Sequence, residues 1–408
     1  MSLRIDADLL IDGVGGKQEA ASVICEGGKI SYVGPTSGAP NAEKILKTPV
    51  VMPGMWECHT HFTGFTQPSV EQAATLNSAE AAARCTWDLK EVLLSGFTSV
   101  REVGGLGVYL KPVVDEGTIQ GPNIYASGQL LSTTGGHGDI HNMKLELVDR
   151  LGELSIGRLA DGPYECVKAV REQVRLGADA IKICASGGVM SKIDNPIDQQ
   201  FSVEEIRAIT EEAARSRISV AAHCHGALGI QAAIDGGVHT IEHGTYLNEE
   251  LADQMIEKGM ILVSTRYVVE KLRPLSESPN MPKYARDKAK KIIDIHLESM
   301  KIALKKGVKM ALGTDIFVSG PGHAMRHGEN ALELKHHVDI GMSPMDAIVM
   351  ATSNGPLTLG ARAPLSGQLK EGYDADVLLI EGNPLEDIQI LTRRELITVI
   401  KSGEVVTP

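Results

Sequence analysis

The sequence predicts an α/β fold, namely a (β/α)8 barrel of the TIM type with a small β-sandwich domain built from both ends of the chain. Three observations predict it. Short apolar runs alternate with amphipathic stretches through the middle of the chain, eight such runs can be counted, and both ends carry short apolar strands broken by glycine turns. Eight strand–helix repeats close into a barrel. An open doubly wound sheet is the main alternative, but no Gly-x-Gly-x-x-Gly motif follows the first strand to supply its phosphate-binding turn.

The two ends of the chain are expected to form the β-sandwich together. Ala375–Ile380 and Thr398–Ile400 are short apolar runs near the end of the chain, and they resemble the strand-and-turn pattern at its start. We therefore place the N-terminal part of the sandwich at residues 1–53, the barrel at residues 54–363 and the C-terminal part of the sandwich at residues 364–408.

The barrel strands and helices follow from the apolar periodicity. The eight predicted strands are Val50–Met52 continuing to Glu57, Thr98–Arg101, Asn123–Ser127, Ala180–Ile183, Ser219–Ala222, Thr240–Glu242, Ile261–Ser264 and Lys309–Gly313. The clearest helical patterns are Ser78–Leu94, Tyr164–Leu176, Val203–Arg217, Leu228–Asp235 and Asn248–Lys258. Two long loops, Ala185–Phe201 and Glu270–Ala285, are expected to cover a site at the carboxyl ends of the strands.

Composition narrows the classes of partner. The 408 residues carry 52 acidic against 40 basic side chains, a formal net charge of -12 that disfavours attraction to nucleic acid or to an anionic membrane. No window approaches eighteen unbroken apolar residues, so no membrane insertion is expected. The six cysteines lack paired-thiol spacing, which argues against a disulfide framework and favours a reducing cytoplasm. A small-molecule partner is expected, and a homo-oligomer stays open.

The first strand ends in a histidine pair. In Trp56-Glu57-Cys58-His59-Thr60-His61, the two histidines are separated by one residue, so on an extended chain their side chains project to the same side. Both imidazoles can then bind one metal ion. On its own the pair is equally compatible with hydrogen-bonded loop histidines.

A lysine interrupts the apolar fourth strand. Lys182 lies within Asp179-Ala180-Ile181-Lys182-Ile183, where a charged ammonium in the barrel interior would be costly. It could extend to the strand end or pair with Asp315. The alternative is carboxylation by carbon dioxide, which converts the amine into a carbamate whose two oxygens bridge two cations.

Three further strands end in residues that bind metals. His223 closes the fifth run, His243 follows the sixth, and Asp315 follows the eighth. His225 shares the side of His223, whereas Cys224 points toward the helices as small core filler. Each could be a structural residue by itself, but their appearance in order at successive strand ends favours one shared site.

With metal-binding residue types in this order at its strand ends, the sequence resembles the amidohydrolase superfamily over nearly its whole length. The motifs that carry the resemblance are Pro53 through His61, Gly313-Thr314-Asp315 and the tail motif Gly372 through Leu378. The resemblance implies two divalent metal ions, with zinc as the default. Their ligands would be His59 and His61 on the more buried ion, His223 and His243 on the more exposed ion, the Lys182 carbamate as bridge, and Asp315 on the buried ion. The bridging lysine favours hydrolases of amides, esters or phosphoesters over deaminases.

The resemblance also implies a mechanism. A hydroxide shared by the two ions attacks the substrate carbonyl, and Asp315 takes the released proton and passes it to the departing amine. His137, in the glycine-rich segment after the third strand, and His225 are candidates to donate to the oxyanion. Either histidine is equally compatible with a structural role.

Within the superfamily the sequence most resembles metal-dependent Xaa-Pro dipeptidases and carboxypeptidase-like enzymes, in Arg101 through Gly105, Gly135 through Gly138, Ala185 through Val189 and Gly320 through His323. This implies cleavage of a dipeptide or an N-acyl amino acid. Arg266, followed by Tyr267, is placed to pair with the substrate carboxylate, with a structural ion pair as the equal alternative. A lactonase, a carbamate hydrolase, a mycotoxin amidase or a non-catalytic dihydropyrimidinase-like scaffold stay open.

Overall fold

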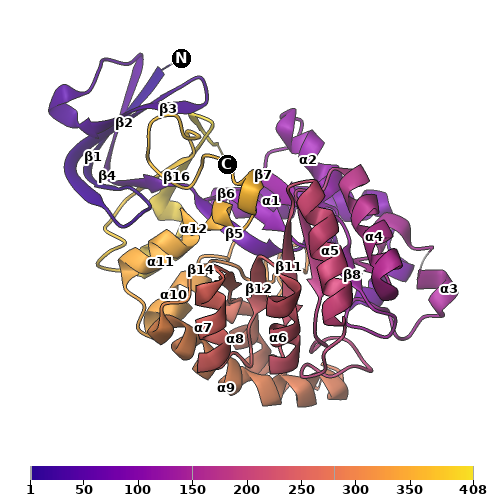
Figure 1. Cartoon of the computed structure of the whole chain (residues 1–408). Coiled ribbons are helices and arrows are strands. Elements are labelled where there is room, and N and C mark those ends of the chain that lie inside the picture. The colour runs from indigo at the N-terminus through magenta and orange to yellow at the C-terminus, as the bar shows by residue number, and fades with distance from the viewer. Residues whose placement is uncertain (1, 149, 280, 408) are drawn as a thin grey trace.

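Parallel strands form a central barrel, as the sequence predicts (Figure 1). The computed structural model describes residues 2–148, 150–279 and 281–407. The barrel strands are β5 (Met55–Thr60), β6 (Phe97–Glu102), β7 (Asn123–Ala126), β8 (Leu130–Ser132), β10 (Ala180–Cys184), β11 (Ser219–Cys224), β12 (Thr240–His243), β13 (Ile261–Val263) and β14 (Met310–Ala311). β7 and β8 together form the third of the eight barrel positions, and β9 (Gly157–Leu159) pairs with β8. All these pairings are parallel.

Hydrogen bonds beyond the named strands close the barrel. The amide of Cys58 on β5 donates to the carbonyl of Leu312 after β14 at 2.8 Å, and the amide of Asp315 donates to the carbonyl of His59 at 2.7 Å. On the other side, the amide of Asp179 before β10 donates to the carbonyl of Ala126 on β7 at 2.7 Å. The carboxyl ends of strands one and eight are therefore tied together beside the predicted metal ligands.

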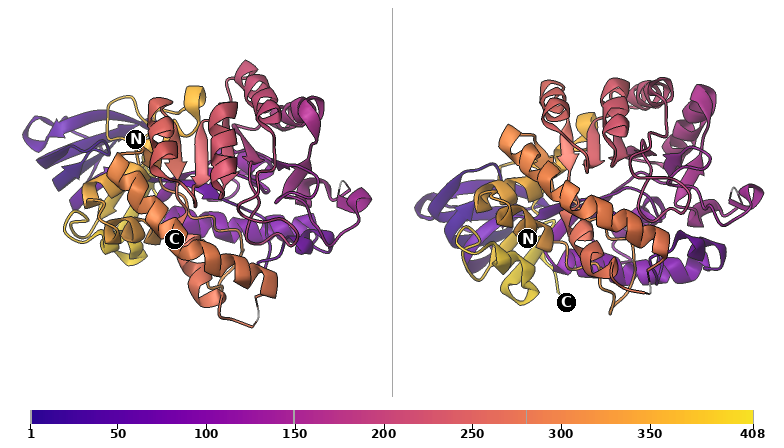
Figure 2. Two further views of the ribbon diagram at one scale, coloured as in Figure 1. Left: turned by 60° about the horizontal axis from the view of Figure 1, so that its bottom comes forward. Right: turned by 90° about the horizontal axis from the view of Figure 1, so that it is seen from below.

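Helices surround the barrel because each buries one apolar face against the strands. α1 has the predicted bounds, and the side chain of Asn77 caps it by accepting from the amide of Ala79. The helices are α1 (Ser78–Leu94), α2 (Gly107–Asp115), α3 (Leu145–Val148), α4 (Gly162–Leu176), α5 (Val203–Arg215), α6 (Ala227–Gly236), α7 (Glu249–Glu257), α8 (Arg266–Leu275), α9 (Lys283–Lys306), α10 (Leu332–Asp339), α11 (Pro344–Ala351) and α12 (Asn354–Leu357). The two views of Figure 2 show α9, in orange, as the longest of them, lying across one end of the barrel.

The two termini form one seven-stranded sheet, seen in indigo and yellow in Figure 1. Its strands are β1 (Ser2–Ile11), β2 (Lys17–Glu26), β3 (Lys29–Pro35), β4 (Lys44–Pro53), β15 (Val377–Ile380), β16 (Ile397–Lys401) and β17 (Glu404–Val405). β4 pairs in parallel with β1 and antiparallel with β15, so the two ends of the chain meet there. A separate apolar cluster that includes Ile5, Val23 and Val377 fills this small domain.

Two predicted boundaries are wrong. The run predicted as one strand from Val50 to Glu57 is two strands, because β4 ends at Pro53 in the terminal sheet and β5 begins at Met55 in the barrel. Gly54 lies at the junction, where an added Cβ would lie 2.1 Å from Oγ1 of Thr98. The expected loop Glu270–Ala285 is mostly helical, because α8 continues to Leu275 and α9 begins at Lys283.

The described residues contain no helix that is both long enough and apolar enough to cross a membrane. All six cysteines are buried as free thiols. Burial raises the pKa of these thiols, for example that of Cys58 to about 12. They therefore act as small apolar filler, as predicted for Cys224.

Candidate metal-binding active site

The ends of five barrel strands bring the six predicted metal ligands to one place. His59 and His61 come from β5, Lys182 from β10, His223 from β11, His243 from β12 and Asp315 from the segment after β14. All six line one cavity of about 570 Å³ at the carboxyl ends of the strands.

Asp315 lies at the centre of one half of the cluster. Its Oδ1 is 3.2 Å from Nε2 of His61 and 3.6 Å from Nε2 of His59. Nζ of Lys182 is 3.2 Å from the same His59 nitrogen, and the lysine is 2% exposed. Burial would raise the pKa of Asp315, but its contacts with His61, His59 and Lys182 outweigh burial and lower that pKa to about 2. Asp315 is therefore a carboxylate at neutral pH.

Three more imidazoles form the other half. The rings of His223 and His243 lie 4.6 Å apart between centroids, and those of His225 and His243 lie 4.9 Å apart. Two sets of three side chains offer ligand atoms within 4.8 Å of one another, namely His223, His225 and His243, and His59, His243 and Asp315. His243 belongs to both sets, so the two halves form one continuous cluster.

Each histidine is held by one ring nitrogen, which leaves the other for the cluster. Nδ1 of His61 bonds to the carbonyl of Gly104 at 2.7 Å, and Nδ1 of His243 bonds to Oγ1 of Thr265 at 2.7 Å. His223 uses the opposite nitrogen, since its Nε2 bonds to the carbonyl of Gly187 at 3.1 Å. Such outer contacts fix the tautomer and orientation of metal-binding histidines.

A buried ion pair supports His59. Oε2 of Glu242 accepts from Nδ1 of His59 at 2.7 Å, and both Glu242 oxygens accept from Arg101 Nη2, at 2.7 and 2.9 Å. The side chains of Glu242 and Arg101 are 0% exposed. Burial alone would raise the pKa of Glu242, but Arg101 and His59 outweigh it and hold that pKa below its usual value.

The backbone at the cluster adopts uncommon conformations. His243, Thr265 and Asp315 have φ of 68°, 53° and 61°, in the left-handed region that non-glycine residues rarely enter. Such strain gathers at functional sites, where surrounding contacts hold it. Glu57 provides contacts of this kind, because Oε1 accepts from the amides of His59 at 2.8 Å and Thr314 at 3.0 Å.

The donor set fits metal ions. Nε2 of His243 is buried and has no hydrogen-bond partner within the described ranges, which is costly unless a ligand meets it. Burial lowers the pKa of Lys182, and it also lowers the pKa of His59 to about 4. Neutral imidazoles, a carboxylate and an uncharged amine are the forms in which these residues bind metals or carbon dioxide.

The two candidate oxyanion donors both line the cavity. The ring of His137 stacks on that of His223 with centroids 4.3 Å apart, and its Nδ1 lies 2.9 Å from Oγ of Ser191. Nδ1 of His225 lies 2.6 Å from Oγ1 of Thr245. The structure thus brings both histidines to the metal-ligand cluster.

Arg266 and Tyr267 are not brought to the cavity. Arg266 is 1% exposed, and its guanidinium donates to Glu270 and to the carbonyl of Ile293. The Tyr267 hydroxyl donates to Glu329 at 2.9 Å. Neither residue is among those that line the cavity. Arg266 therefore forms a structural ion pair, which is the alternative to binding a substrate carboxylate. At the start of α8 its side chain points toward α9.

Sequence reasoning missed the apolar wall of the cavity. α8 contributes Val268, Val269 and Leu272, and the segment before α9 contributes Met281. These residues belong to one apolar cluster with the first half of α9. The strong amphipathic pattern of α8 could have predicted this helix and its buried apolar face. Pro274 instead led to the prediction of a loop in this region.

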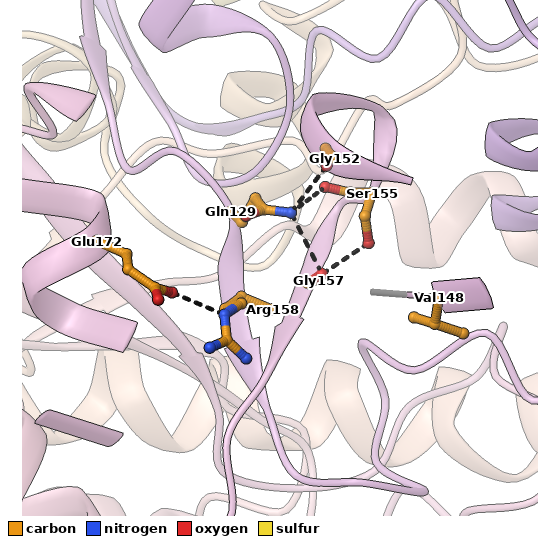
Figure 3. Close-up of a pocket in the computed structure, with 7 residues that line it drawn as sticks. All are labelled: Gln129, Val148, Gly152, Ser155, Gly157, Arg158 and Glu172. Carbon is orange, nitrogen blue, oxygen red and sulfur yellow. Dashed lines mark hydrogen bonds and ion pairs between the residues drawn. The ribbon is translucent and has the colours of Figure 1, made fainter. Parts of the chain in front are cut away.

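A second, smaller hollow of about 320 Å³ lies away from this cluster (Figure 3). Its polar side chains are engaged with each other and with the backbone. Nε2 of Gln129 donates to the carbonyls of Gly152 and Ser155, both at 3.1 Å, and Arg158 pairs with Glu172 at 2.8 Å. None of the predicted site residues lines it.

Fold and donor set together define the class of metal-dependent barrel hydrolases. The chain belongs, more specifically, to the amidohydrolase family, whose model matches residues 50–406. The resemblance drawn from the strand-end motifs is thereby confirmed.

Three relatives illustrate the similarity. Ochratoxinase of Aspergillus niger is 41% identical over 417 residues, which cover 98% of this chain and 85% of that protein. Its crystal structure matches with a TM-score of 0.92 over 99% of this chain and 95% of that one. A Xaa-Pro dipeptidase with methionine bound in the active site is 34% identical with a TM-score of 0.88, and a prolidase complexed with N-methylphosphonate-L-proline is 31% identical with a TM-score of 0.92. Both cover 100% of each chain.

Proposed function

We propose that the protein is a binuclear metal-dependent amidohydrolase that cleaves the amide bond of N-acyl amino acids and dipeptides whose side chains or acyl groups are large and apolar. One observation carries the proposal. The six-donor cluster lies in the same cavity as an apolar wall formed by residues such as Val269, Leu272 and Met281. A cavity of about 570 Å³ has room for a substrate of this size.

The metal assignment rests on the donor types. His59, His61 and Asp315 would hold one divalent ion, His223 and His243 the other, and Lys182 as a carbamate would bridge them, with zinc the preferred metal. When bound, such ions lower the pKa of water and polarise a carbonyl oxygen. Carboxylation requires an uncharged amine, and the burial of Lys182 favours that form.

Other steps of the proposed reaction, namely proton transfer and stabilisation of the oxyanion, are assigned to side chains of the protein. Asp315 is ionised and 25% exposed at its side chain, so it accepts the proton of the attacking water and delivers it to the amine that departs. His137 and His225 face the same space and donate to the oxygen that becomes negative in the transition state. Glu242 and Arg101 keep His59 in the orientation that this arrangement needs.

The relatives support an amino-acid product. Two of the similar structures are named as enzymes of Xaa-Pro or proline substrates, and they hold methionine and a proline derivative. The relative of Aspergillus niger is named for ochratoxin. The preference for a large apolar group follows from the wall of this cavity rather than from those names.

The test is a screen of metal-replete protein against amides of graded size. We expect N-benzoyl-L-phenylalanine to be cleaved with a kcat/KM about 10- to 100-fold above that of N-acetyl-L-alanine, because an apolar pocket gains about 1–3 kcal/mol from such added groups. L-Xaa-L-Pro dipeptides with large apolar first residues should also be cleaved. Asp315→Asn is the matched control, since it should keep the metals and lose turnover.

Other outcomes would identify a different function. Turnover of lactones or carbamates with all amides inert would refute amide specificity and leave the lactonase or carbamate hydrolase alternative. Protein that purifies without about two equivalents of transition metal, and that takes up none on titration, would match the non-catalytic scaffold.

A further inference from the structure

The turn between β13 and α8 has a strained backbone. Thr265, the residue just before α8, has φ of 53° and ψ of 41°, in the left-handed region that residues branched at Cβ rarely enter. It is 0% exposed. A conformation of this kind persists only where surrounding contacts hold it, so the neighbours of Thr265 should carry such contacts.

Thr265 lies at the N-cap of α8 but does not cap the helix. The side chain of an N-cap threonine normally accepts from the amide of the second or third helical residue, and in the described part of the chain Thr265 makes no such bond. Its Oγ1 instead lies 2.7 Å from Nδ1 of His243. The first amides of α8, those of Arg266 and Tyr267, therefore need another acceptor.

Glu333 on α10 provides that acceptor. Its Oε1 accepts from the amide of Arg266 at 2.8 Å, and its Oε2 accepts from the amide of Tyr267. α10 lies against α8, and Glu333 is 0% exposed. The positive end of the α8 dipole also favours a carboxylate at this place. An acidic side chain from a neighbouring helix thus caps α8 in place of the threonine.

The residue before Thr265 is held as well. Oγ of Ser264 lies 2.7 Å from Oε1 of Glu333 and 2.7 Å from Nε2 of His337, and it donates to the carboxylate because an ionised carboxylate can only accept. The Ser264 carbonyl accepts from Nε2 of His296 on α9 at 2.8 Å. Contacts on both sides of Thr265 therefore fix its backbone, and Glu333 takes part on both sides.

The fixed backbone sets the direction of the Thr265 hydroxyl. A side chain branched at Cβ has few rotamers, so its direction follows from the backbone. Here the hydroxyl meets the ring nitrogen of His243 that points away from the other candidate ligands. Outer contacts of this kind orient metal-binding histidines, and their loss typically weakens metal binding about 10- to 100-fold.

We propose that Glu333 is a positioning residue for the more exposed metal ion, because it caps α8 in place of Thr265 and so keeps the Thr265 hydroxyl on His243. The inference rests on the metal assignment of the proposed function. It gives a role to a residue that is not among the described residues lining the cavity. Without the carboxylate, the uncapped amides of α8 would attract the Thr265 hydroxyl away from His243.

The first test is a double-mutant cycle on zinc affinity, measured on metal-free protein by competition with a chromophoric chelator. In Glu333→Gln one oxygen becomes an NH2 group that cannot accept from an amide, and we expect the affinity for one of the two zinc equivalents to fall about tenfold. Thr265→Val should cause a similar loss, whereas Thr265→Ser should keep most of the affinity. In the Thr265→Val background, Glu333→Gln should change the affinity less than about twofold, because its route through the hydroxyl has been removed.

Glu329→Gln is the matched control. Glu329 also holds α8, but through side chains, since it accepts from the Tyr267 hydroxyl at 2.9 Å and from Nζ of Lys271 at 2.8 Å. Its loss should lower the melting temperature and leave both zinc affinities within about twofold of the wild type. Unchanged affinity in Glu333→Gln, an equal loss from it in both backgrounds, or an equal loss in Glu329→Gln would overturn the proposal. If Glu333→Gln does not fold, Ser264→Ala, which removes a single donor to Glu333, is compared in the two backgrounds instead.

Hydrogen exchange on metal-free protein separates this inference from the proposed function. The amides of Arg266 and Tyr267 report the cap of α8, and we expect them to exchange about tenfold faster in Glu333→Gln and at the wild-type rate in Thr265→Val. Faster exchange in Thr265→Val would show that the threonine is the cap and that the assignment is wrong. If the wild type takes up no metal, the proposed function fails, and the exchange rates still decide whether Glu333 caps α8. If metal binds and the two losses of affinity are additive, this inference alone fails.

Discussion

Replacing Glu242 by Gln should both destabilise the barrel and weaken metal binding, because this one carboxylate serves Arg101 and His59. The substitution keeps the shape of the side chain and removes its charge. Arg101 would then lie with 0% of its side chain exposed and without its counter-ion. Breaking a buried pair by removing one partner costs about 3–5 kcal/mol.

The cost converts into a measurable shift in melting temperature. An unfolding entropy of about 2.1 cal/mol/K per residue gives about 0.9 kcal/mol/K for the 408 residues. The expected decrease is therefore about 4–6 °C, measured by calorimetry on metal-free protein. Glu249→Gln is the matched control, since that glutamate is 60% exposed and lies 3.5 Å from Lys305. Its loss should shift the melting temperature by no more than about 1 °C.

Metal affinity provides the second measurement. His59 loses its anionic acceptor in Glu242→Gln, and loss of such an outer partner typically weakens metal binding about 10- to 100-fold. The double variant Arg101→Met, Glu242→Leu should regain much of the stability, because apolar side chains can replace a buried pair, yet it should not regain the affinity. A Glu242→Gln protein that melts within about 1 °C of the wild type and titrates zinc with unchanged affinity would refute the reasoning.

Three further substitutions test other parts of the site and fold. Lys182→Ala should lose one or both metals and most activity, with partial rescue by short carboxylic acids plus excess zinc; a fully metallated, active variant would contradict the carbamate assignment. Asp315→Asn should abolish turnover before metal binding, as metal content and kcat measured on one preparation would reveal. Glu333 accepts from the amide of Arg266 and from His337, and although burial alone would raise its pKa, these contacts lower it to about 2. Because its pKa is lower in the folded protein, ionised Glu333 stabilises the fold above a pH of about 4.5, and this stabilisation is lost as the pH falls toward 2. In the wild type the loss between pH 5 and pH 3 should lower the free energy of unfolding by about 2 kcal/mol. Glu333→Gln cannot titrate and should lack this part of the pH dependence.

The candidate metal-ligand cluster could be predicted because its members lie at or near the carboxyl ends of apolar runs. His59 and His61 follow the period of two on a strand, and Lys182 is a charge within an otherwise apolar strand. Parallel strands bring their carboxyl ends to one face, so sequence order at strand ends becomes proximity in space. The helix Ser78–Leu94 follows from its apolar periodicity, and the structure confirms both bounds.

The partners of those ligands could not be predicted in the same way. Arg101 and Glu242 are separated by 141 positions, and no sequence pattern identifies Glu242 as the residue that holds both Arg101 and His59. A charged residue inside an apolar strand indicates that it has a partner of opposite charge. Which residue is the partner depends on how far neighbouring barrel strands are shifted along one another. Arg266 illustrates the same limit, because Thr265 has φ of 53° and redirects the chain so that the guanidinium points to α9.

The α8 and α9 pair shows why specificity is harder to predict than chemistry. An amphipathic helix predicts a buried face, yet the pattern is the same whether that face covers a core or lines a cavity. Here α8 does both, since Val269 packs in an apolar cluster and lines the substrate space. α9 also carries Lys288, which fastens the loop bearing Ser191. The α8 and α9 pair thus forms the apolar wall of the cavity and contacts the loop after β10, so we expect substitutions in this pair to alter substrate preference and turnover together.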